Sequence, residues 1–210
     1  AALTVEQALQ REDLPEARRQ LAWHLVSRDT QALDVGQVAG ATIESVAENT
    51  SDGIVAPLVY YAIGGLPLAW IYRFANTLDS MWGYRTERYE WLGKAAARLD
   101  DGLNWLPARL TAFLLVLAAW LRHENSRRAL AVMRRDARTT PSPNAGYPMS
   151  AMAGALGVEL EKVGHYRLGG GLAEPKVGDI RRAIRLMQTA TFIGVGVLSL
   201  GSFLFRRHHR

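Results

Sequence analysis

Carboxylate side chains recur four residues apart at Glu44, Glu48 and Asp52. On a helix this spacing puts Glu44 and Glu48 on one face, and Asp52 continues that face if the helix persists. Asn49 lies just off the same face. Like charges at this spacing repel each other, so they are best tolerated where water is abundant or a cation neutralises them. A solvated acidic face is the plain alternative, because most carboxylates lie at the surface.

Two further polar clusters stand at the edges of apolar segments. Asn76 and Asp79 share a helical face directly after one such segment, and Asp100 and Asp101 precede the next one. Helix capping is the structural alternative for each cluster, because Asp and Asn favour N-caps. Capping needs no paired acids, however, and it does not explain three clusters that all stand at segment edges. We therefore interpret the three clusters as parts of one site.

Carboxylate and amide oxygens are hard ligands of the kind that Mg²⁺ prefers, and protein-bound Mg²⁺ commonly holds nucleotide phosphates as well. Arginine side chains bind phosphate or carboxylate oxygens through two parallel hydrogen bonds. The candidates are Arg28, Arg98 and Arg109, although Arg28 and Arg98 could equally form structural ion pairs. The residue types therefore favour a site that handles Mg²⁺ and phosphate.

The elements that must position these residues are apolar. Residues 53–72 and 186–205 carry no charge over the length that a helix needs to cross the hydrocarbon core of a bilayer. Residues 103–121 are a weaker candidate, for which a buried core helix is the soluble alternative. The sequence Gly64-Gly65-Leu66-Pro67 interrupts the first segment, so a broken or re-entrant pair of half-helices is expected there.

The pattern predicts an all-α fold, a polytopic helical membrane protein with one re-entrant or broken apolar segment and polar helical loops. Residues 1–210 are expected to form a single integral-membrane domain. Amphipathic helices are predicted within 5–26, a helix at 42–49 and a helix rich in small residues at 149–163. Residues 139–148 and 168–175 are predicted to be loops from their proline and glycine content.

Composition narrows the classes of function. The net charge is +5 and the pI about 9.8, and the basic excess lies largely in residues 122–138 and in the tail at 206–210. Basic clusters beside apolar segments are typical of juxtamembrane charge, and no basic and aromatic stripe indicates base stacking, so no nucleic-acid partner is expected. The chain has no cysteine, which excludes disulfides, thiolate metal sites and a cysteine nucleophile. Walker phosphate-loop and His-Glu-x-x-His zinc motifs are also absent from the sequence.

Four sequence blocks, taken in order, resemble one known family. The first comprises residues 26–30 and 44–53, the second 72–84, the third 97–101 with 107–111, and the fourth 142–149. The most specific stretch is Asn76-Thr77-Leu78-Asp79-Ser80-Met81. Order and spacing resemble the adenosylcobinamide-phosphate synthases of cobalamin biosynthesis, the CobD/CbiB family, over about residues 14–205. Members of that family begin with further membrane segments, so the resemblance implies that this chain corresponds to the C-terminal two-thirds of a full-length member.

The resemblance implies an acid–amine ligase. The reaction would be ATP-dependent amide formation between aminopropanol, or aminopropanol phosphate, and a carboxylate of (adenosyl)cobyric acid, giving (adenosyl)cobinamide or its phosphate. Mg²⁺ is then the expected cofactor and ATP the cosubstrate. The expected partners are the corrinoid and amine substrates, the lipid bilayer and other membrane enzymes of the cobalamin pathway, with a multi-pass location in the cell (inner) membrane. Two alternatives stay open: a membrane sensor or regulator that resembles the AmpE-type proteins, and a transporter whose acids coordinate ions at helix breaks.

On this basis each candidate residue receives a predicted role. The predicted catalytic residues are Glu48, Asp79 and Asp100. The predicted metal ligands are Glu44, Glu48, Asp52, Asp79, Asp100 and Asp101. The residues predicted to bind substrate or nucleotide are Arg28, Asn49, Asn76, Arg98, Arg109, Ser142 and Asn144.

The prediction of three membrane-spanning segments conflicts with the prediction that the polar clusters form one site. If all three apolar segments simply spanned the bilayer, Glu48 and Asn144 would lie on one side and Asp79 and Asp100 on the other. Re-entry of the first segment would return Asp79 but would not by itself reunite Asn144 with the rest. We nevertheless predict that these four side chains converge on one polar cavity.

Overall fold

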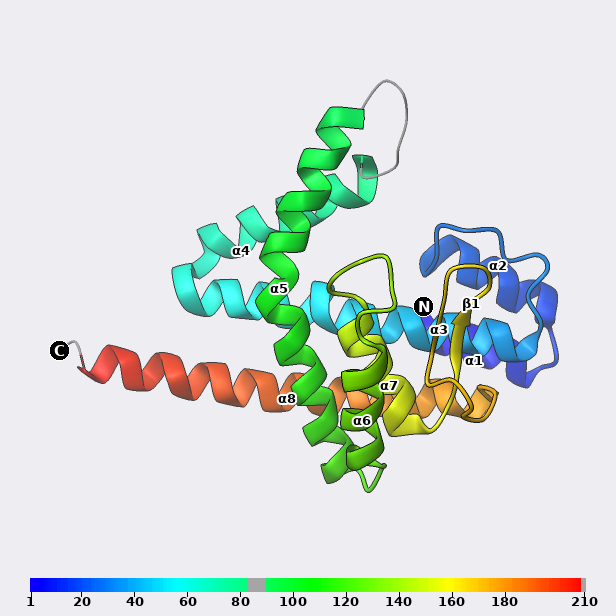
Figure 1. The fold of residues 1–210 in the computed structure, drawn as a ribbon. Helices are drawn as coiled ribbons and strands as arrows, with labels where there is room; N and C mark the ends of the chain where they lie inside the picture. Colours follow the sequence, from blue (N-terminus) through cyan, green and yellow to red (C-terminus); the bar gives the residue numbers. More distant parts are fainter. Residues whose placement is uncertain (83–89, 209–210) are drawn as a thin grey trace.

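The computed structural model describes residues 1–82 and 90–208, drawn as a ribbon in Figure 1. Over these residues the chain is helical apart from one two-stranded hairpin and an isolated bridge, which agrees with the predicted helical class. Gly83 and Tyr84, at the end of the second sequence block, lie outside the described residues, as do His209 and Arg210 of the basic tail.

The elements follow one another with short connections. In chain order they are α1 (Ala2–Gln10), α2 (Leu14–His24), α3 (Val35–Asn49), the π-helix η1 (Thr50–Val55), α4 (Ala56–Trp82), α5 (Glu90–Leu121), α6 (Ser126–Asp136), α7 (Gly146–Leu156), β1 (Leu160–Lys162), β2 (Tyr166–Leu168) and α8 (Val177–His208).

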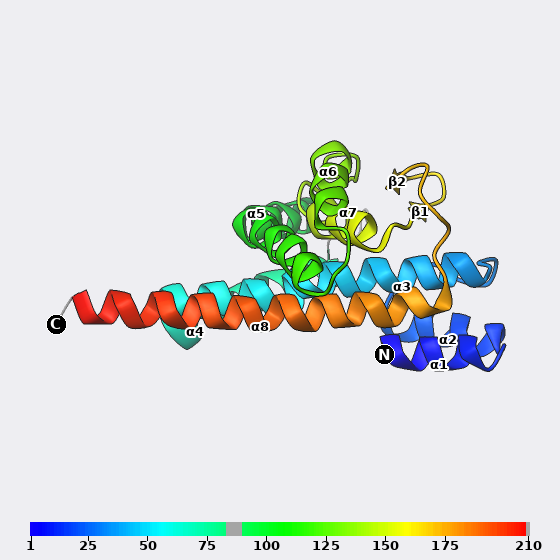
Figure 2. The same ribbon diagram turned by 90° about the horizontal axis from the view of Figure 1, so that it is seen from below.

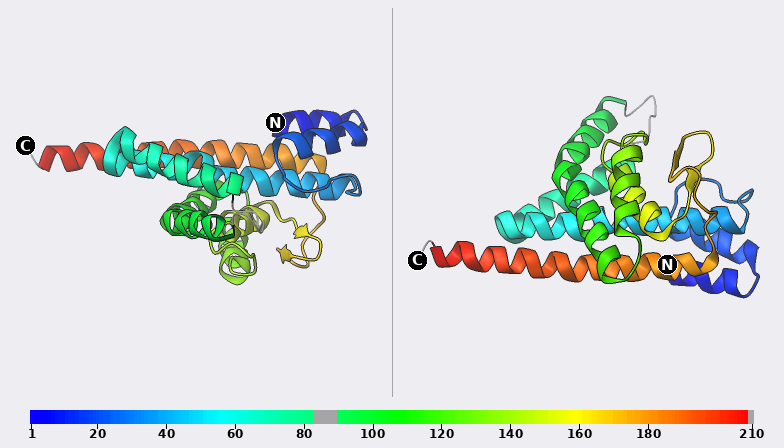
Figure 3. Two further views of the ribbon diagram at one scale, coloured as in Figure 1. Left: turned by 90° about the horizontal axis from the view of Figure 1, so that it is seen from above. Right: turned by 60° about the horizontal axis from the view of Figure 1, so that its bottom comes forward.

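The helices are arranged in three layers (Figures 2 and 3). The middle layer contains α3, η1 and the first half of α4, with α8 beside them and running in the same direction. Helices α1 and α2 cover one side of this layer, and α5, α6, α7 and the hairpin cover the other. A charged tie joins the outer helix α1 to the middle layer, because Arg181 of α8 binds the buried Glu6 at 3.0 Å.

Local sequence explains where these helices begin and end. Helix α3 starts seven residues before the predicted 42 because Asp34 and Gln37 form a reciprocal capping box at its N-terminus. The predicted helix at 149–163 is wrong in its second half. Helix α7 ends at Leu156, and the next residue, Gly157, has a φ of +79° that favours glycine. The chain then enters the hairpin rather than continuing as helix.

The first apolar segment is broken, as the sequence predicts. Gly64 (φ −135°, ψ 18°) and Gly65 (φ +67°, ψ −159°) leave the helical region, and Pro67 lies in the half that follows. The second half of α4 turns back from the line of α3 and approaches the start of α5 (Figure 1). The residues at the end of α4 are therefore returned to the neighbourhood of η1 and α5, which positions the site described below.

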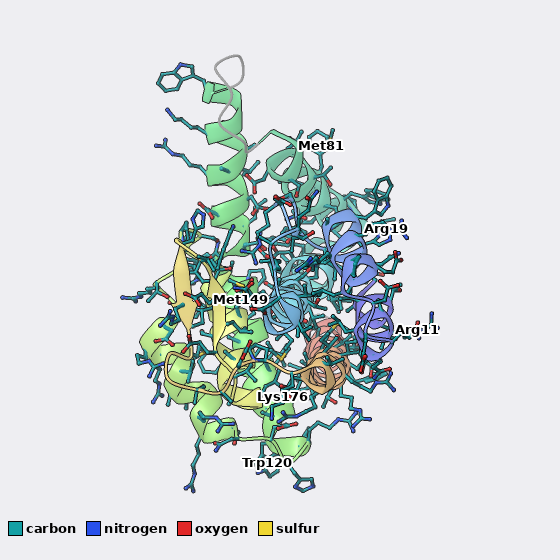
Figure 4. All side chains as sticks on the ribbon, turned by 90° about the vertical axis from the view of Figure 1, so that its right-hand side faces the viewer. Arg11, Arg19, Met81, Trp120, Met149 and Lys176 are labelled. Carbon is teal, nitrogen blue, oxygen red and sulfur yellow. The ribbon has the colours of Figure 1, made fainter. Side chains whose placement is uncertain are left out.

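Two stretches are long and apolar enough to cross a membrane, Val35–Met81 and Gly93–Leu121. The expected segment 186–205 is not among those found in the described part of the chain. Only 17% of the most apolar window of the first stretch is buried, whereas the core helix of a soluble protein would be mostly covered. Met81 near the end of α4 and Trp120 near the end of α5 project from opposite ends of the molecule, and both are largely exposed (Figure 4).

Candidate active site

A polar cavity of about 700 Å³ lies where η1, the second half of α4, α5 and the loop before α7 meet. Its walls carry carboxylates, amides, hydroxyls and two basic side chains. The polar residues that line it are Glu48, Ser51, Asp52, Asn76, Asp79, Ser80, Lys94, Arg98, Asp100, Asp101, Asn104, Ser142 and Asn144. The cavity therefore collects residues from each of the four sequence blocks.

The π-helix η1 forms one wall of the cavity. Glu48 ends α3 just before η1, and Ser51 and Asp52 lie within it. Single π-turns inside helices are frequently found at functional sites. Ser51 is 1% exposed, and its hydroxyl oxygen has no hydrogen-bond partner among the described residues. This wall thus presents two carboxylates and an unsatisfied hydroxyl.

A network of neutral donors holds Asp100. The Asn76 amide donates to Asp100 Oδ1 at 3.2 Å, and the Asn104 amide donates to Asp100 Oδ2 at 2.9 Å. The Tyr72 hydroxyl donates to Asn104 Oδ1 at 2.8 Å, and Tyr60 stacks on the Tyr72 ring with centroids 5.1 Å apart. Both carboxylate oxygens of Asp100 are oriented by amides, which leaves its negative charge uncompensated by this network.

A second arrangement holds Asn144 where the loop before α7 meets α5. The Asn144 amide donates to the Asp101 carbonyl oxygen at 2.7 Å and accepts from Arg109 at 3.1 Å. The guanidinium of Arg109 lies between two rings, 4.4 Å from the centre of Trp105 and 4.2 Å from that of Tyr147. Hydrogen bonding from Arg138 holds the pKa of the Tyr147 phenol below its ordinary value against the opposing effect of burial, and the Arg109 charge adds to this lowering.

The predicted convergence is confirmed, because Glu48, Asp79, Asp100 and Asn144 all line the one cavity. The break at Gly64 and Gly65 resolves the topological conflict for Asp79, since it folds α4 back toward η1. Asn144 is returned separately, by the loop that packs against α5. Five other residues of the predicted set line the same cavity: Asp52, Asn76, Arg98, Asp101 and Ser142. The roles assigned to these residues stay predictions.

Four predicted site residues lie outside this cavity. Arg28 and Glu44 form an ion pair with nitrogen and oxygen 3.5 Å apart, in a separate smaller cavity. Asn49 points back along α3, where its amide donates to the Ser45 carbonyl oxygen at 2.9 Å. Arg109 lies behind Asn144 and contacts it rather than the cavity. The four-residue spacing correctly predicted one helical face, but that face is shared between two cavities.

Sequence analysis missed two residues of the site, Tyr72 and Lys94, and gave no role to Asn104, which lies four residues beyond Asp100. Tyr72 and Asn104 complete the network around Asp100, and Lys94 lines the cavity with Arg98. Spacing could have identified them, because Tyr72 lies four residues before Asn76 and Lys94 lies four residues before Arg98 on one helical face.

The donor set fits Mg²⁺ that is shared with a substrate, rather than a metal held by protein alone. Within residues 1–82 and 90–208 no group of three acidic or histidine side chains is close enough to form a ready-made metal site. Mg²⁺ usually binds through one or two carboxylates, with water and phosphate oxygens completing its octahedron. Asp79, Asp100 and Asp101 offer such carboxylates, and Lys94 and Arg98 beside them offer cations for phosphate.

Fold and site together define a helical protein whose apolar stretches are long enough to cross a membrane and which carries an acid-rich polar cavity at their junction. A sequence model of the family described as "CobD/Cbib protein" matches residues 1–191. The chain belongs to the CobD/CbiB family.

Several curated proteins are similar over most of the chain. The cobalamin biosynthesis protein CobD of Geobacter metallireducens is 51% identical over 83% of this chain and 54% of its own length. CobD of Klebsiella pneumoniae is 44% identical over 96% of this chain and 67% of its own length. CbiB of Salmonella typhimurium is 43% identical over 94% of this chain and 64% of its own length. The chain thus spans between about half and two thirds of the length of these relatives, and no solved structure matches it.

Proposed function

We propose that the protein acts in cobalamin biosynthesis as an ATP-dependent acid–amine ligase of a cell membrane. It would join the amino group of aminopropanol, or of aminopropanol phosphate, to a carboxylate of (adenosyl)cobyric acid. Membership of the CobD/CbiB family supports the pathway, and relatives over 40% identical carry cobalamin biosynthesis in their names. The observation that carries the chemistry is the single cavity in which the acids, amides and cations of all four sequence blocks meet.

The proposed reaction has two steps. A carboxylate is a poor electrophile, so one of its oxygens first bonds to the γ-phosphorus of ATP while the bond from that phosphorus to the β-phosphate bridge breaks and ADP leaves. The amine nitrogen then attacks the carbonyl carbon of the acyl phosphate, the C–N bond forms, and phosphate leaves as the C–O bond breaks. The ammonium must lose one proton before it attacks and a second during amide formation, so a nearby base is needed.

The cavity residues suit these requirements. Lys94 and Arg98 on α5 are placed to bind phosphate oxygens, where positioning and charge neutralisation supply most of the catalysis of phosphoryl transfer. Mg²⁺ held by Asp79, Asp100 or Asp101 would neutralise further phosphate charge. Glu48 is proposed as the base, because its carboxylate lines the cavity together with the α5 acids and cations and is exposed.

A bilayer is the proposed surrounding of the apolar helices. Exposed aromatic and aliphatic side chains gather on α4, and a soluble monomer seldom leaves so many contiguous ones uncovered. The largest of them are Tyr61, Ile63, Leu66, Trp70, Ile71 and Phe74. The α4 residues that line the polar cavity, Asn76, Asp79 and Ser80, lie in the last turns of this helix and away from the glycine break.

Mass spectrometry of the reaction products tests the proposal. The full-length protein in detergent or vesicles is incubated with cobyric acid, ATP-Mg²⁺ and either amine, and a cobinamide-type product is expected only when ATP is present. Asp100→Asn removes the charge from the centre of the amide network and is expected to lower turnover by at least roughly 100-fold. Asp13→Asn is the matched control, because Asn also caps helices and Asp13 caps α2 in a different layer.

Each other outcome contradicts a part of the proposal. Absence of product with both amines, from protein that is folded and binds ATP, would reject the ligase and favour a regulator. Movement of labelled substrate across vesicles without ATP-linked product would favour a transporter. Full turnover by Asp100→Asn would remove Asp100 from the catalytic set.

A further inference from the structure

A second, smaller cavity of about 340 Å³ lies between the α2–α3 loop, helix α3 and the β1–β2 hairpin. Two acidic side chains, Glu44 and Glu48, and two basic ones, Arg28 and Lys162, line it together with Tyr166. Glu48 also lines the large cavity, so the two cavities meet at this side chain. The smaller cavity has the volume of a site for a small molecule.

Glu44 is the residue that most clearly points to a ligand site here. The residue is 6% exposed, and one of its carboxylate oxygens, Oε1, is buried without a hydrogen-bond partner among the described residues. The other oxygen, Oε2, has a long contact of 3.5 Å with Arg28. A buried carboxylate oxygen with no donor is costly, and a ligand that supplies an N–H would remove the cost.

The basic side chains of the cavity have donors to spare. The structure describes one ion-pair contact for Arg28, although its guanidinium has five N–H groups. Lys162 of β1 interacts electrostatically with Glu44 and Glu48, yet across residues 1–82 and 90–208 its ammonium makes no hydrogen bond or close ion pair. A ligand with an anionic group would therefore find two cations at the same cavity that offers two carboxylates to an ammonium.

We propose that this cavity binds a small amine that also carries a phosphate group. Glu44 and Glu48 bind the ammonium, and Arg28 and Lys162 bind the phosphate. Because Glu48 borders both cavities, the amino group lies next to the large cavity, where the activated carboxylate would be attacked. The assignment of the amine as a substrate rests on the proposed ligase function, whereas the binding site itself does not.

The hairpin thereby becomes part of the site. Lys162 and Tyr166 lie outside the four sequence blocks, and nothing in the local sequence indicates a binding role for them. The Tyr166 hydroxyl lines the cavity, where it interacts with the Glu44 carboxylate and makes a weak contact with the sulfur of Met149, 3.9 Å away. Met149 lies in the interior beside the hairpin (Figure 4). Burial raises the pKa of this phenol, so it stays a neutral hydrogen-bond donor at physiological pH.

Calorimetric titration of the purified full-length protein tests the proposal directly. The probes are 1-amino-2-propanol, its O-phosphate and inorganic phosphate. The wild type is expected to bind the phosphorylated amine at least about tenfold more tightly than either of the other two. Lys162→Gln is expected to weaken the phosphorylated amine by about tenfold or more and to leave the free amine unchanged, whereas Glu44→Gln should weaken both amines. Lys176→Gln, at an exposed lysine before α8 (Figure 4), is the matched control and should bind all probes as the wild type does.

The possible results distinguish the proposal of an amine-binding cavity from the proposal of ligase activity. Wild-type affinity of Lys162→Gln for the phosphorylated amine would overturn the subsite, as would equal binding of the two amines by the wild type. Tight binding with the expected mutant pattern but no amide product would leave the subsite in place and reject the ligase. Amide product with an unchanged amine KM in both variants would support the ligase and reject the subsite. If Glu44→Gln does not fold, Lys162→Gln decides alone, because Lys162 is partly exposed and its loss leaves no buried group unpaired.

Discussion

Acidic side chains are held in two different ways in two regions of this molecule. At the large cavity Asp100 is bound by the amides of Asn76 and Asn104, and among the described residues no cation bonds its carboxylate directly. Arg73 reaches only the side-chain oxygen of Asn76, at 3.2 Å. Where α6 meets the hairpin, Asp136 is bound by the guanidinium of Arg135 at 2.6 and 2.8 Å. It also accepts from the buried Gly169 N–H at 2.7 Å.

The two arrangements suggest two roles for a buried acid. Some carboxylates stabilise the fold, and we call these ties, whereas others can act on a ligand, and we call these site carboxylates. A carboxylate whose two oxygens are both bound by one arginine, as in Asp136, has its charge compensated, and the bond from Gly169 then joins α6 to the hairpin region. A carboxylate held by amides is fixed in direction but keeps its charge, so it can still act on a metal ion or an ammonium. We therefore expect substitutions of the first kind to lower stability and substitutions of the second kind to lower ligand binding.

The largest expected effect on stability follows from Asp136→Ala. The substitution leaves the Gly169 N–H buried without an acceptor and removes the contact with Arg135, so the free energy of unfolding should fall by about 2–3 kcal/mol. Denaturant unfolding in detergent measures the loss. The activity per folded molecule should be unchanged, and a large fall in activity would break the distinction between ties and sites.

The same carboxylate predicts a dependence on pH. Hydrogen bonding from Arg135 holds the pKa of Asp136 below its ordinary value, and the Gly169 N–H adds to this against the effect of burial. Because the folded pKa lies below the unfolded one, the stabilisation is complete above the unfolded pKa, about 3.9, and is lost as the pH falls through the folded pKa. The difference in unfolding midpoint between the wild type and Asp136→Asn should therefore narrow as the pH is lowered below about 4. A constant difference down to the acid limit would contradict this account.

Sequence analysis predicted the local positions of the site residues better than it predicted which of them share a cavity. The spacing of Glu44 and Glu48 fixes them to one face of α3, and Gly64-Gly65-Leu66-Pro67 predicts the break that returns Asp79. The division of the acidic face between two cavities depends instead on which elements cover it. The hairpin that does so was predicted partly as helix, because nothing in 149–163 except Gly157 interrupts a helical pattern.

The hydrogen-bond network around Asp100 could not be predicted from the sequence for a related reason. Tyr72 looks like one more apolar-segment aromatic, and its hydroxyl contact with Asn104 joins residues 32 positions apart. Such a contact depends on how α4 and α5 cross, which local spacing does not determine. The position of Arg109 could not be predicted for the same reason. Only the packing of α5 against α7 places its guanidinium between Trp105 and Tyr147.

Tyr72→Phe sharpens the account of the amide-held acid. It removes one hydroxyl whose partner, Asn104, is buried, so the free energy of unfolding should fall by about 1 kcal/mol. With Asn104 free to rotate, Asp100 loses a fixed donor, and the affinity for ATP-Mg²⁺ should also fall by several-fold. Tyr61→Phe is the control, because Tyr61 is 58% exposed and does not belong to this network. Equal effects of the two substitutions would show that the Tyr72 hydroxyl does not orient the site.

The smallest effect on stability is expected for Arg109→Lys. This substitution tests whether an arginine beside the cavity stabilises the fold or binds a ligand. Lysine keeps the positive charge but cannot lie flat between two rings while donating to Asn144. Loss of this stacking should lower the free energy of unfolding by about 0.5–1 kcal/mol. Because Asn144 is then less firmly held, kcat should fall modestly while the KM for ATP is unchanged. A large rise in that KM with unchanged stability would instead mean that Arg109 binds the nucleotide directly, so that a cation next to an acid-rich cavity is not always a tie.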